Sequence, residues 1–514
     1  MMRRIVGAAF VLTVVAFVTG LMLAAATPQI EAGAILAHIK FLASDDMRGR
    51  AAGSPELERA GDYVAQQFKA AGLTPGGTGG GWFQPFELQA GLIVGERNAL
   101  RIGTPEQSAR LAIGSSYYPL ATAPNDSLAV PSADLTHLPL VFAGYGIAAP
   151  AFKYDDYAGL DVTGKAVIVF SHEPQENRTD SRLNGAQALS ESTLAAKAQA
   201  ATSHGARLLL VVSDPTHTVD QGEYGRFAIA PDPDEQTIPV LRVRRAEMLP
   251  LLQAWALDEA AAAIERDLVP RSRALAGSDV DYTEFLARNR RTVRNVVGLL
   301  PGADTARRNQ AIVIGGHYDH VGLGGRYSMT PERTGEIHNG ADDNASGISA
   351  IIEMARAAMA DRARFPRTLV FVAFAGEELG LLGSAHYAEH PAVPLRDTVA
   401  MIDLDMVGRA NGRVETSGIS MAPSLQRDLD AAAKATRGIR LGTNGPGSGR
   451  SDDSSFIERR IPAVIFFTGF HDDYHRPGDD WDKIDAPGTA RVAALALEFA
   501  ARIAARPDRP PFVD

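Results

Sequence analysis

From residue 295 onward, short and continuously apolar segments alternate with amphipathic ones, and this alternation limits the chain to few folds. The apolar segments are candidate strands at 311–314, 369–374, 399–407 and 463–467. Between them, apolar residues recur at helical spacing. Strands that are apolar on both sides must be covered on both sides. We therefore expect an α/β three-layer sandwich, with helices on both faces of a mixed, mostly parallel central sheet.

Polar side chains follow the ends of these strands, where a sheet of this kind carries its catalytic groups. They come from five separate parts of the sequence and include His317 with Asp319, Asp342, Glu377 with Glu378, Asp405, and His475. One such cluster alone is ordinary solvated surface. Five in order, each at the end of a strand or in the loop after it, indicate a shared site.

The residue types point to a metal centre. Asp405 lies within an apolar strand. Burying its carboxylate there costs free energy unless the carboxylate is paired or binds a cation. Asp319 stands two residues after His317 and can hold the His317 ring in place with its carboxylate. The adjacent acids Glu377 and Glu378 point in different directions, so one can act as a base and the other as a ligand. Asp342, in a polar turn before a helix, is interpreted as the carboxylate that bridges two metal ions.

Composition narrows the possible ligands and partners. The 514 residues contain no cysteine, so any transition-metal site must use histidine and carboxylate ligands. A net charge of -10 argues against nucleic-acid binding, which requires a clustered positive surface.

The N-terminus has the features of an export signal. Arg3 and Arg4 precede an uncharged apolar run over residues 5–26, which ends in small residues that suit cleavage. We expect an exported protein, periplasmic or extracellular. The alternative is a membrane anchor through residues 5–26.

We predict five segments. A signal peptide or anchor (1–26) precedes the N-terminal part of a catalytic domain (27–132), an inserted β-rich module (133–285), the main catalytic part (286–507) and a C-terminal tail (508–514).

Together these motifs resemble the co-catalytic di-zinc aminopeptidases of the bacterial leucyl aminopeptidase type, within the zinc exopeptidases. The resemblance rests on the His-x-Asp element at 317–319, the Gly-Ala-Asp-Asp-Asn-Ala-Ser-Gly element at 340–347, the Glu-Glu-x-Gly element at 377–380 and the Leu-Asp-Met element at 404–406. By the same resemblance, the inserted module looks like a protease-associated domain.

The resemblance implies two zinc ions per chain, although cobalt or manganese could bind the same residues. One zinc ion would take Glu378 and His475, the other would take His317 and Asp405, and Asp342 would bridge both. Glu377 would be the general base, and the Asp342–Asp343 peptide bond would be cis. The expected substrates are peptides with a free N-terminus, whose terminal residue is removed by hydrolysis.

One departure and several alternatives stay open. Where the family commonly has Ser-Asp-His, this chain has Ser451-Asp452-Asp453. His320 and His338 are interpreted as loop polar residues rather than ligands, and Asp403 is not counted as a ligand. The alternatives are a carboxypeptidase or dipeptidase, which would need a basic pocket (Arg409, Arg450 and Arg476 are candidates), a glutaminyl-cyclase-like transferase, and a non-catalytic peptide-binding or receptor-like protein.

Overall fold

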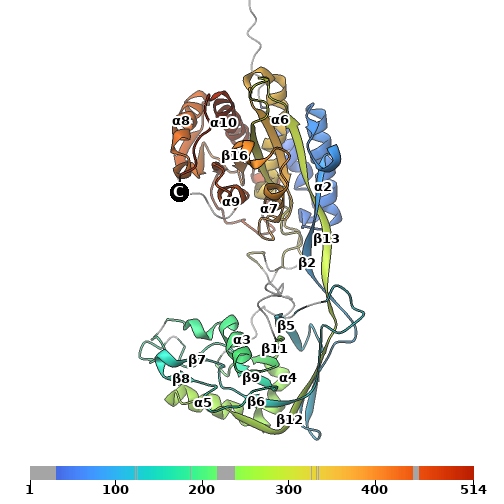
Figure 1. Cartoon of the computed structure of the whole chain (residues 1–514), viewed down its shortest axis with the longest axis vertical. Coiled ribbons are helices and arrows are strands. Elements are labelled where there is room, and N and C mark those ends of the chain that lie inside the picture. Colours follow the sequence, from blue (N-terminus) through green and yellow to red (C-terminus); the bar gives the residue numbers. More distant parts are fainter. Residues whose placement is uncertain are drawn as a thin grey trace, which may run out of the picture.

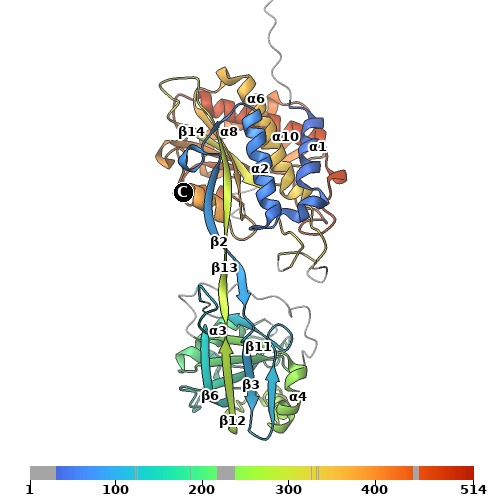
Figure 2. The ribbon, with the colours of Figure 1, turned by 90° about the vertical axis from the view of Figure 1, so that its right-hand side faces the viewer.

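The computed structural model describes residues 30–513, except 122, 124, 177, 186, 217–237, 326, 331–332, 334 and 444–450. The predicted signal peptide or anchor therefore lies outside the described residues. Within the part that is described, we find no helix of the length and apolarity that crossing a membrane requires. The chain forms two units joined by a long two-stranded ribbon (Figures 1 and 2).

The first unit is built on a mixed sheet of nine strands, counted among the described residues. Its central strands run parallel in the order β15-β14-β16-β19. Their bounds are β14 (Ala311–His317), β15 (Thr368–Phe374), β16 (Thr398–Leu404) and β19 (Ala463–Phe467). Around them lie β1 (Thr74–Pro75), β2 (Phe83–Val94), β13 (Leu286–Leu300), β17 (Arg413–Ser417) and β18 (Arg440–Thr443).

Helices cover both faces of this sheet, as the apolar strands require. One face packs against α1 (Ala32–Leu42), α2 (Pro55–Ala70), α6 (Gly347–Ala360), α8 (Gln426–Ala435) and α10 (Ala486–Ala505). The other face packs against α7 (Leu382–Glu389) and α9 (Asp453–Ile457). Successive residues of β14 alternate between the two cores, with Ile312 on the first and Val313 on the second. The predicted α/β sandwich with a mixed central sheet is confirmed, but among the described strands four pairings are parallel and four are antiparallel, so the sheet is parallel only at its centre and between β17 and β18.

The second unit contains an eight-stranded sheet among the described residues. Its strands are β3 (Ala99–Gly103), β4 (Ser108–Leu111), β5 (Tyr117–Ala121), β6 (Ala133–Phe142), β9 (Ala166–Phe170), β10 (Leu208–Val212), β11 (Val240–Val243) and β12 (Arg273–Glu284). A small hairpin, β7 (Ala148–Ala149) and β8 (Tyr154–Asp155), and three helices, α3 (Leu194–Ser203), α4 (Arg245–Ala254) and α5 (Leu257–Asp267), complete it.

The ribbon between the units is formed by β2 and β13, which pair antiparallel from Leu286 opposite Val94 to Val296 opposite Phe83. The sequence prediction began the inserted module at residue 133, but β3, β4 and β5 already belong to the second sheet. The second unit therefore starts near residue 95, directly after β2.

Candidate metal centre

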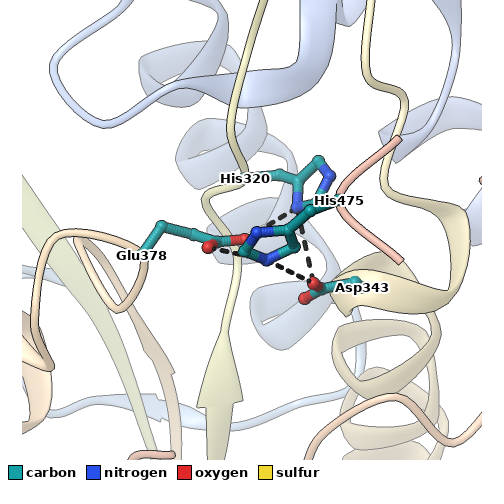
Figure 3. A group of neighbouring side chains, drawn as sticks. All are labelled: His320, Asp343, Glu378 and His475. Carbon is teal, nitrogen blue, oxygen red and sulfur yellow. Dashed lines mark hydrogen bonds and ion pairs between the residues drawn. The ribbon is translucent and has the colours of Figure 1, made fainter. Parts of the chain in front are cut away.

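The loops after the parallel strands of the first unit bring histidine and carboxylate side chains together in two adjoining groups. One group consists of His320, Asp343, Glu378 and His475 (Figure 3). The other consists of His317, Asp343 and Asp405. Within each group, one donor atom from every residue lies within 4.8 Å of the others.

Asp343 belongs to both groups, with one carboxylate oxygen on each side. Its Oδ1 lies 3.3 Å from His317 Nε2, and its Oδ2 lies 3.1 Å from His475 Nε2. On the first side, His475 Nε2 is also 3.0 Å from Glu378 Oε2. On the second side, His317 Nε2 is 3.4 Å from Asp405 Oδ1. A carboxylate in this position can bridge two cations.

Asp342, which the sequence prediction made the bridging ligand, is placed elsewhere. Its Oδ1 accepts hydrogen bonds from the Gly408 N–H at 2.6 Å and the Ser346 hydroxyl at 3.0 Å. Its Oδ2 lies 3.2 Å from Nε2 of His471. The structure contradicts the bridging role of Asp342, because its carboxylate contacts Gly408, Ser346 and His471 and is absent from the donor groups. The predicted cis peptide bond is also one residue off, since it joins Asp343 to Asn344.

The turn that carries both acids is fixed by neighbouring groups. The backbone N–H groups of Asp342 and Asp343 both donate to Asp479 Oδ2, at 2.9 and 3.0 Å. Gly340 starts the turn at a φ of 60°, and a Cβ there would lie 2.2 Å from the Asp343 carbonyl oxygen. Only glycine fits this position. At the other end, Asn344 Oδ1 accepts from the N–H of Gly347, the first residue of α6, at 3.0 Å.

The ring nitrogens of two histidines are oriented for cation binding. His475 Nδ1 donates to the Tyr327 carbonyl at 2.6 Å, and His317 Nδ1 lies 3.1 Å from the Asp319 carbonyl. In a neutral ring the Nε2 atom then carries the lone pair. His475 Nε2 makes no hydrogen bond, although carboxylate oxygens lie within 3.1 Å of it. A lone pair facing carboxylates in a buried site is the arrangement that a metal ion stabilises.

The charge balance of the site also favours a cation. Burial acts against protonation of His475, but Glu378 and Asp343 raise its pKa to about 11. Burial likewise opposes protonation of His317, but Glu377, Asp405 and Asp343 raise its pKa well above the ordinary value. The carboxylates of the two groups therefore supply more negative charge than neutral histidines can balance. Their donor set, nitrogen and oxygen without sulfur, suits zinc.

The structure places Asp319 and Glu377 beside these groups. Asp319 is fully buried, and its carboxylate accepts from the Glu377 backbone N–H at 3.2 Å, while it lies 4.0 Å from His317 Nδ1. The carboxylate thus positions the loop that carries Glu377 more directly than it holds the His317 ring. Glu377 Oε2 is 3.9 Å from His317 Nε2. Burial, with repulsion from Glu378 and Asp405, raises the pKa of Glu377 well above its usual range.

The segment that departs from the family pattern adjoins the site, because Ser451 lines the same cavity as His317 and Asp405. The Asp453 N–H donates to Asp403 Oδ2 at 3.0 Å, so Asp403 anchors α9 and is not part of either donor group. Asp452 is fully buried, and this burial raises its pKa to about 7.

Two members of the donor groups were missed by the sequence prediction. Asp343 was passed over for its neighbour Asp342, and His320 was interpreted as a loop residue. His338, the other histidine interpreted in that way, bonds to the Ser328 hydroxyl and the Glu336 carbonyl, at 2.8 and 3.0 Å, and is absent from both groups. The only signal for His320 in the sequence is its position three residues after His317.

A cavity of about 190 Å³ opens onto the second donor group. The site residues that line it are His317, Asp343, Glu377, Asp405 and His475. Its remaining wall is largely apolar and includes Met406, Ile465, Phe467, Phe470 and Tyr474. Among the residues that the structure describes, no lysine or arginine lines this cavity. Of the arginines considered for a carboxylate pocket, Arg409 is paired with Asp473 and Asp479, Arg476 is exposed, and Arg450 lies outside the described residues.

Known proteins of similar sequence or fold include aminopeptidases. A probable leucine aminopeptidase of Arthroderma benhamiae is 24% identical over 306 residues, which cover 54% of this chain and 82% of the relative. The solved structure of an aminopeptidase from Aneurinibacillus sp. strain AM-1 superposes with a TM-score of 0.58 and 25% identity, covering 95% of this chain and 97% of that one. A zinc aminopeptidase from Bacillus subtilis shares the fold, with a TM-score of 0.52, 18% identity, and coverage of 91% and 94%.

The family described as Peptidase family M28 matches residues 295–500. This range contains every residue of the two donor groups. The match of residues 295–500 to this family, the fold and the site together support a metallo-exopeptidase.

Proposed function

We propose that the chain is an aminopeptidase with two zinc ions. Glu378, His475 and one oxygen of Asp343 would hold the first, and His317, Asp405 and the other oxygen of Asp343 would hold the second. The observation that carries this proposal is the position of Asp343, whose two oxygens face a different histidine each, at 3.1 and 3.3 Å. When bound, a zinc pair supplies an activated water and polarises the scissile carbonyl.

Glu377 is the proposed general base. Its carboxylate lines the cavity beside His317, while its backbone is held by Asp319, so the side chain has a defined place next to the reacting groups. It would take the proton of the attacking water and deliver it to the leaving amine. Its raised pKa suits this return of the proton, because a carboxyl group with a pKa nearer to neutrality both accepts and releases protons.

The cavity supports selection of a peptide N-terminus. Its carboxylate-rich floor attracts an amine, and no lysine or arginine among the described residues lines it to receive a substrate carboxylate. The apolar wall would hold the side chain of the terminal residue. These features favour an aminopeptidase over a carboxypeptidase on the same scaffold.

The test compares an unblocked leucyl peptide with its N-acetylated twin, before and after chelation and after zinc is restored. We expect cleavage of the unblocked peptide alone, lost on chelation and regained with zinc. Equal cleavage of the acetylated peptide would refute recognition of the N-terminus. No cleavage of either peptide, despite bound zinc, would favour the glutaminyl-cyclase-like or the peptide-binding alternative.

We further propose that the protein is exported through residues 1–26 and that the second unit is a protease-associated domain. The first proposal rests on the arginines and the apolar run at the N-terminus. Sequencing the N-terminus of the mature protein tests it, and a chain that still begins at Met1 would refute cleavage. Deleting the second unit tests whether it restricts access of long peptides, because that role predicts a changed preference between long and short substrates.

A further inference from the structure

His320 is held where its Nδ1 atom faces the first donor group (Figure 3). The residue is 1% exposed, and its Nδ1 lies 2.8 Å from Glu378 Oε1 and 3.8 Å from Asp343 Oδ2. Its ring has little room to turn. A Cβ on Gly340 would come within 2.5 Å of the His320 ring, and the His475 ring packs edge-on at 5.5 Å.

We propose that His320 is a fourth protein ligand of the metal ion in the first donor group, so that the two metal positions differ in their number of protein ligands. The inference rests on the two-zinc proposal above and goes beyond it. The first position, with His320, Asp343, Glu378 and His475, would be closed by protein donors. The second position, with His317, Asp343 and Asp405, would have three protein donors and stay open to water and substrate. A closed position is typical of structural zinc, and an open one of catalytic zinc.

The spacing of the four donors supports a tetrahedral site. Donors that lie about 2.0 Å from one zinc ion in a tetrahedron are about 3.3 Å apart. In this group the histidine nitrogens lie 2.8 Å from Glu378 Oε1, 3.0 Å from Glu378 Oε2, and 3.1 and 3.8 Å from Asp343 Oδ2, so Glu378 offers a different oxygen to each histidine. These distances scatter around the tetrahedral value. The two histidines approach the same pair of carboxylates, as Figure 3 shows.

The cavity divides the two positions in the same way. All three donors of the second position line the cavity. Of the four donors of the first position, His320 and Glu378 are absent from its lining. Substrate that enters the cavity therefore meets the second position, while the first is partly screened by protein. The position with more donors and less access should bind its zinc more tightly and exchange it more slowly.

The test loads the apo-protein with one equivalent of zinc and counts the imidazole ligands by X-ray absorption. We expect two imidazoles for the wild type, from His320 and His475. For His320→Ala we expect one, together with a fall of about 100-fold in the affinity for the first zinc. His320→Asn places an amide oxygen near the former Nδ1 and should restore part of that affinity.

A matched control separates ligand loss from the loss of a buried histidine. His38 on α1 is also buried and also faces a glutamate, with its Nε2 3.4 Å from Glu353 Oε1. Its bonds are to Tyr63 and Glu353 and to none of the donors. His38→Ala should therefore leave zinc affinity unchanged even if it lowers the unfolding temperature.

The outcomes distinguish this inference from the proposed function. One imidazole in the wild type at one equivalent, or an unchanged zinc affinity in His320→Ala, would overturn the role of His320. If that wild type still binds two zinc ions and cleaves the unblocked peptide, the proposed function stands. If the wild type binds no second zinc ion, the two-zinc proposal fails, whatever the imidazole count at the first.

Discussion

Replacing each of two adjacent aspartates by asparagine tests which of them faces the metals. The two Asp343 carboxylate oxygens face histidine nitrogens at 3.1 and 3.3 Å. Asp343→Asn replaces one of these oxygens by an amide nitrogen, which does not bind zinc. Structural zinc sites with four ligands contribute about 10–16 kcal/mol, or roughly 3–4 kcal/mol per ligand. Loss of one ligand should therefore weaken one zinc by about 10²–10³-fold.

Asp342→Asn should leave both zinc ions in place. The asparagine Oδ1 can still accept from the Gly408 N–H and the Ser346 hydroxyl, which now bond to the Asp342 carboxylate at 2.6 and 3.0 Å. The new amide group would face His471 Nε2. Because His471 Nδ1 accepts from the Asp473 N–H at 3.2 Å, Nε2 carries the proton in the neutral ring and would lose its acceptor. We expect a loss of about 1–3 kcal/mol in the free energy of unfolding, without loss of zinc.

Chelator competition gives the zinc affinity of each variant, elemental analysis gives the stoichiometry, and urea unfolding of the metal-free proteins shows that both variants fold. The reasoning predicts one weakened zinc in Asp343→Asn and two normal ones in Asp342→Asn. The reverse pattern would refute the assignment of Asp343 as the bridging residue.

Three further predictions concern other parts of the molecule. Glu377→Gln should keep both zinc ions and lower turnover by about 10²–10⁴-fold, because only the proton transfer is removed. Steady-state kinetics and zinc analysis of the variant test this, and a normal turnover rate would refute Glu377 as the base. Arg50→Met should lower the free energy of unfolding by at least ~3 kcal/mol in urea, because the buried guanidinium donates to four backbone carbonyls; equal stability would contradict this. Burial lowers the pKa of Lys197 in the folded protein to about 7, below its value in the unfolded chain. Between about pH 7 and pH 10 the unfolded chain therefore binds more protons than the folded protein, and the free energy of unfolding should rise with pH. The rise should flatten in Lys197→Met, and an unchanged slope would exclude Lys197 as its source.

The sheet and the strand ends could be predicted because they follow from burial. A strand that packs against helices on both sides is apolar at every position, as in β15, where all seven residues are buried. Polar residues then become conspicuous where such strands end. This pattern alone located His317, Glu377, Glu378 and Asp405, because each stands within four residues of a buried strand end.

The start of the second unit could not be read from the sequence in the same way. The β2–β13 ribbon passes into the second unit without an intervening linker, and β12 ends two residues before β13 begins. No change in composition marks that passage. The strands β3 and β5 join the second sheet only through pairing with β12 and β11, which follow them by more than 100 residues. Pairing over such a distance leaves no local pattern to find.

Whether Asp342 or Asp343 faces the donor groups depends on the backbone path of a tight turn. The sequence does not determine that path, because both residues are aspartates at adjacent positions. In the folded chain the two residues have different tasks. Asp342 uses its oxygens to accept from Gly408 and Ser346, and so ties the turn to the loop after β16. Asp479 holds the turn from the other side through both backbone N–H groups.

These bonds leave the Asp343 side chain as the carboxylate of the pair that faces His317 and His475. Gly340 also lies close to the His320 ring, since a Cβ at residue 340 would come within 2.5 Å of it. The turn at 340–347 therefore contacts donors of both proposed metal positions. A change at an anchoring residue such as Asp479 should loosen both positions together, whereas a change at His320 should affect only the first.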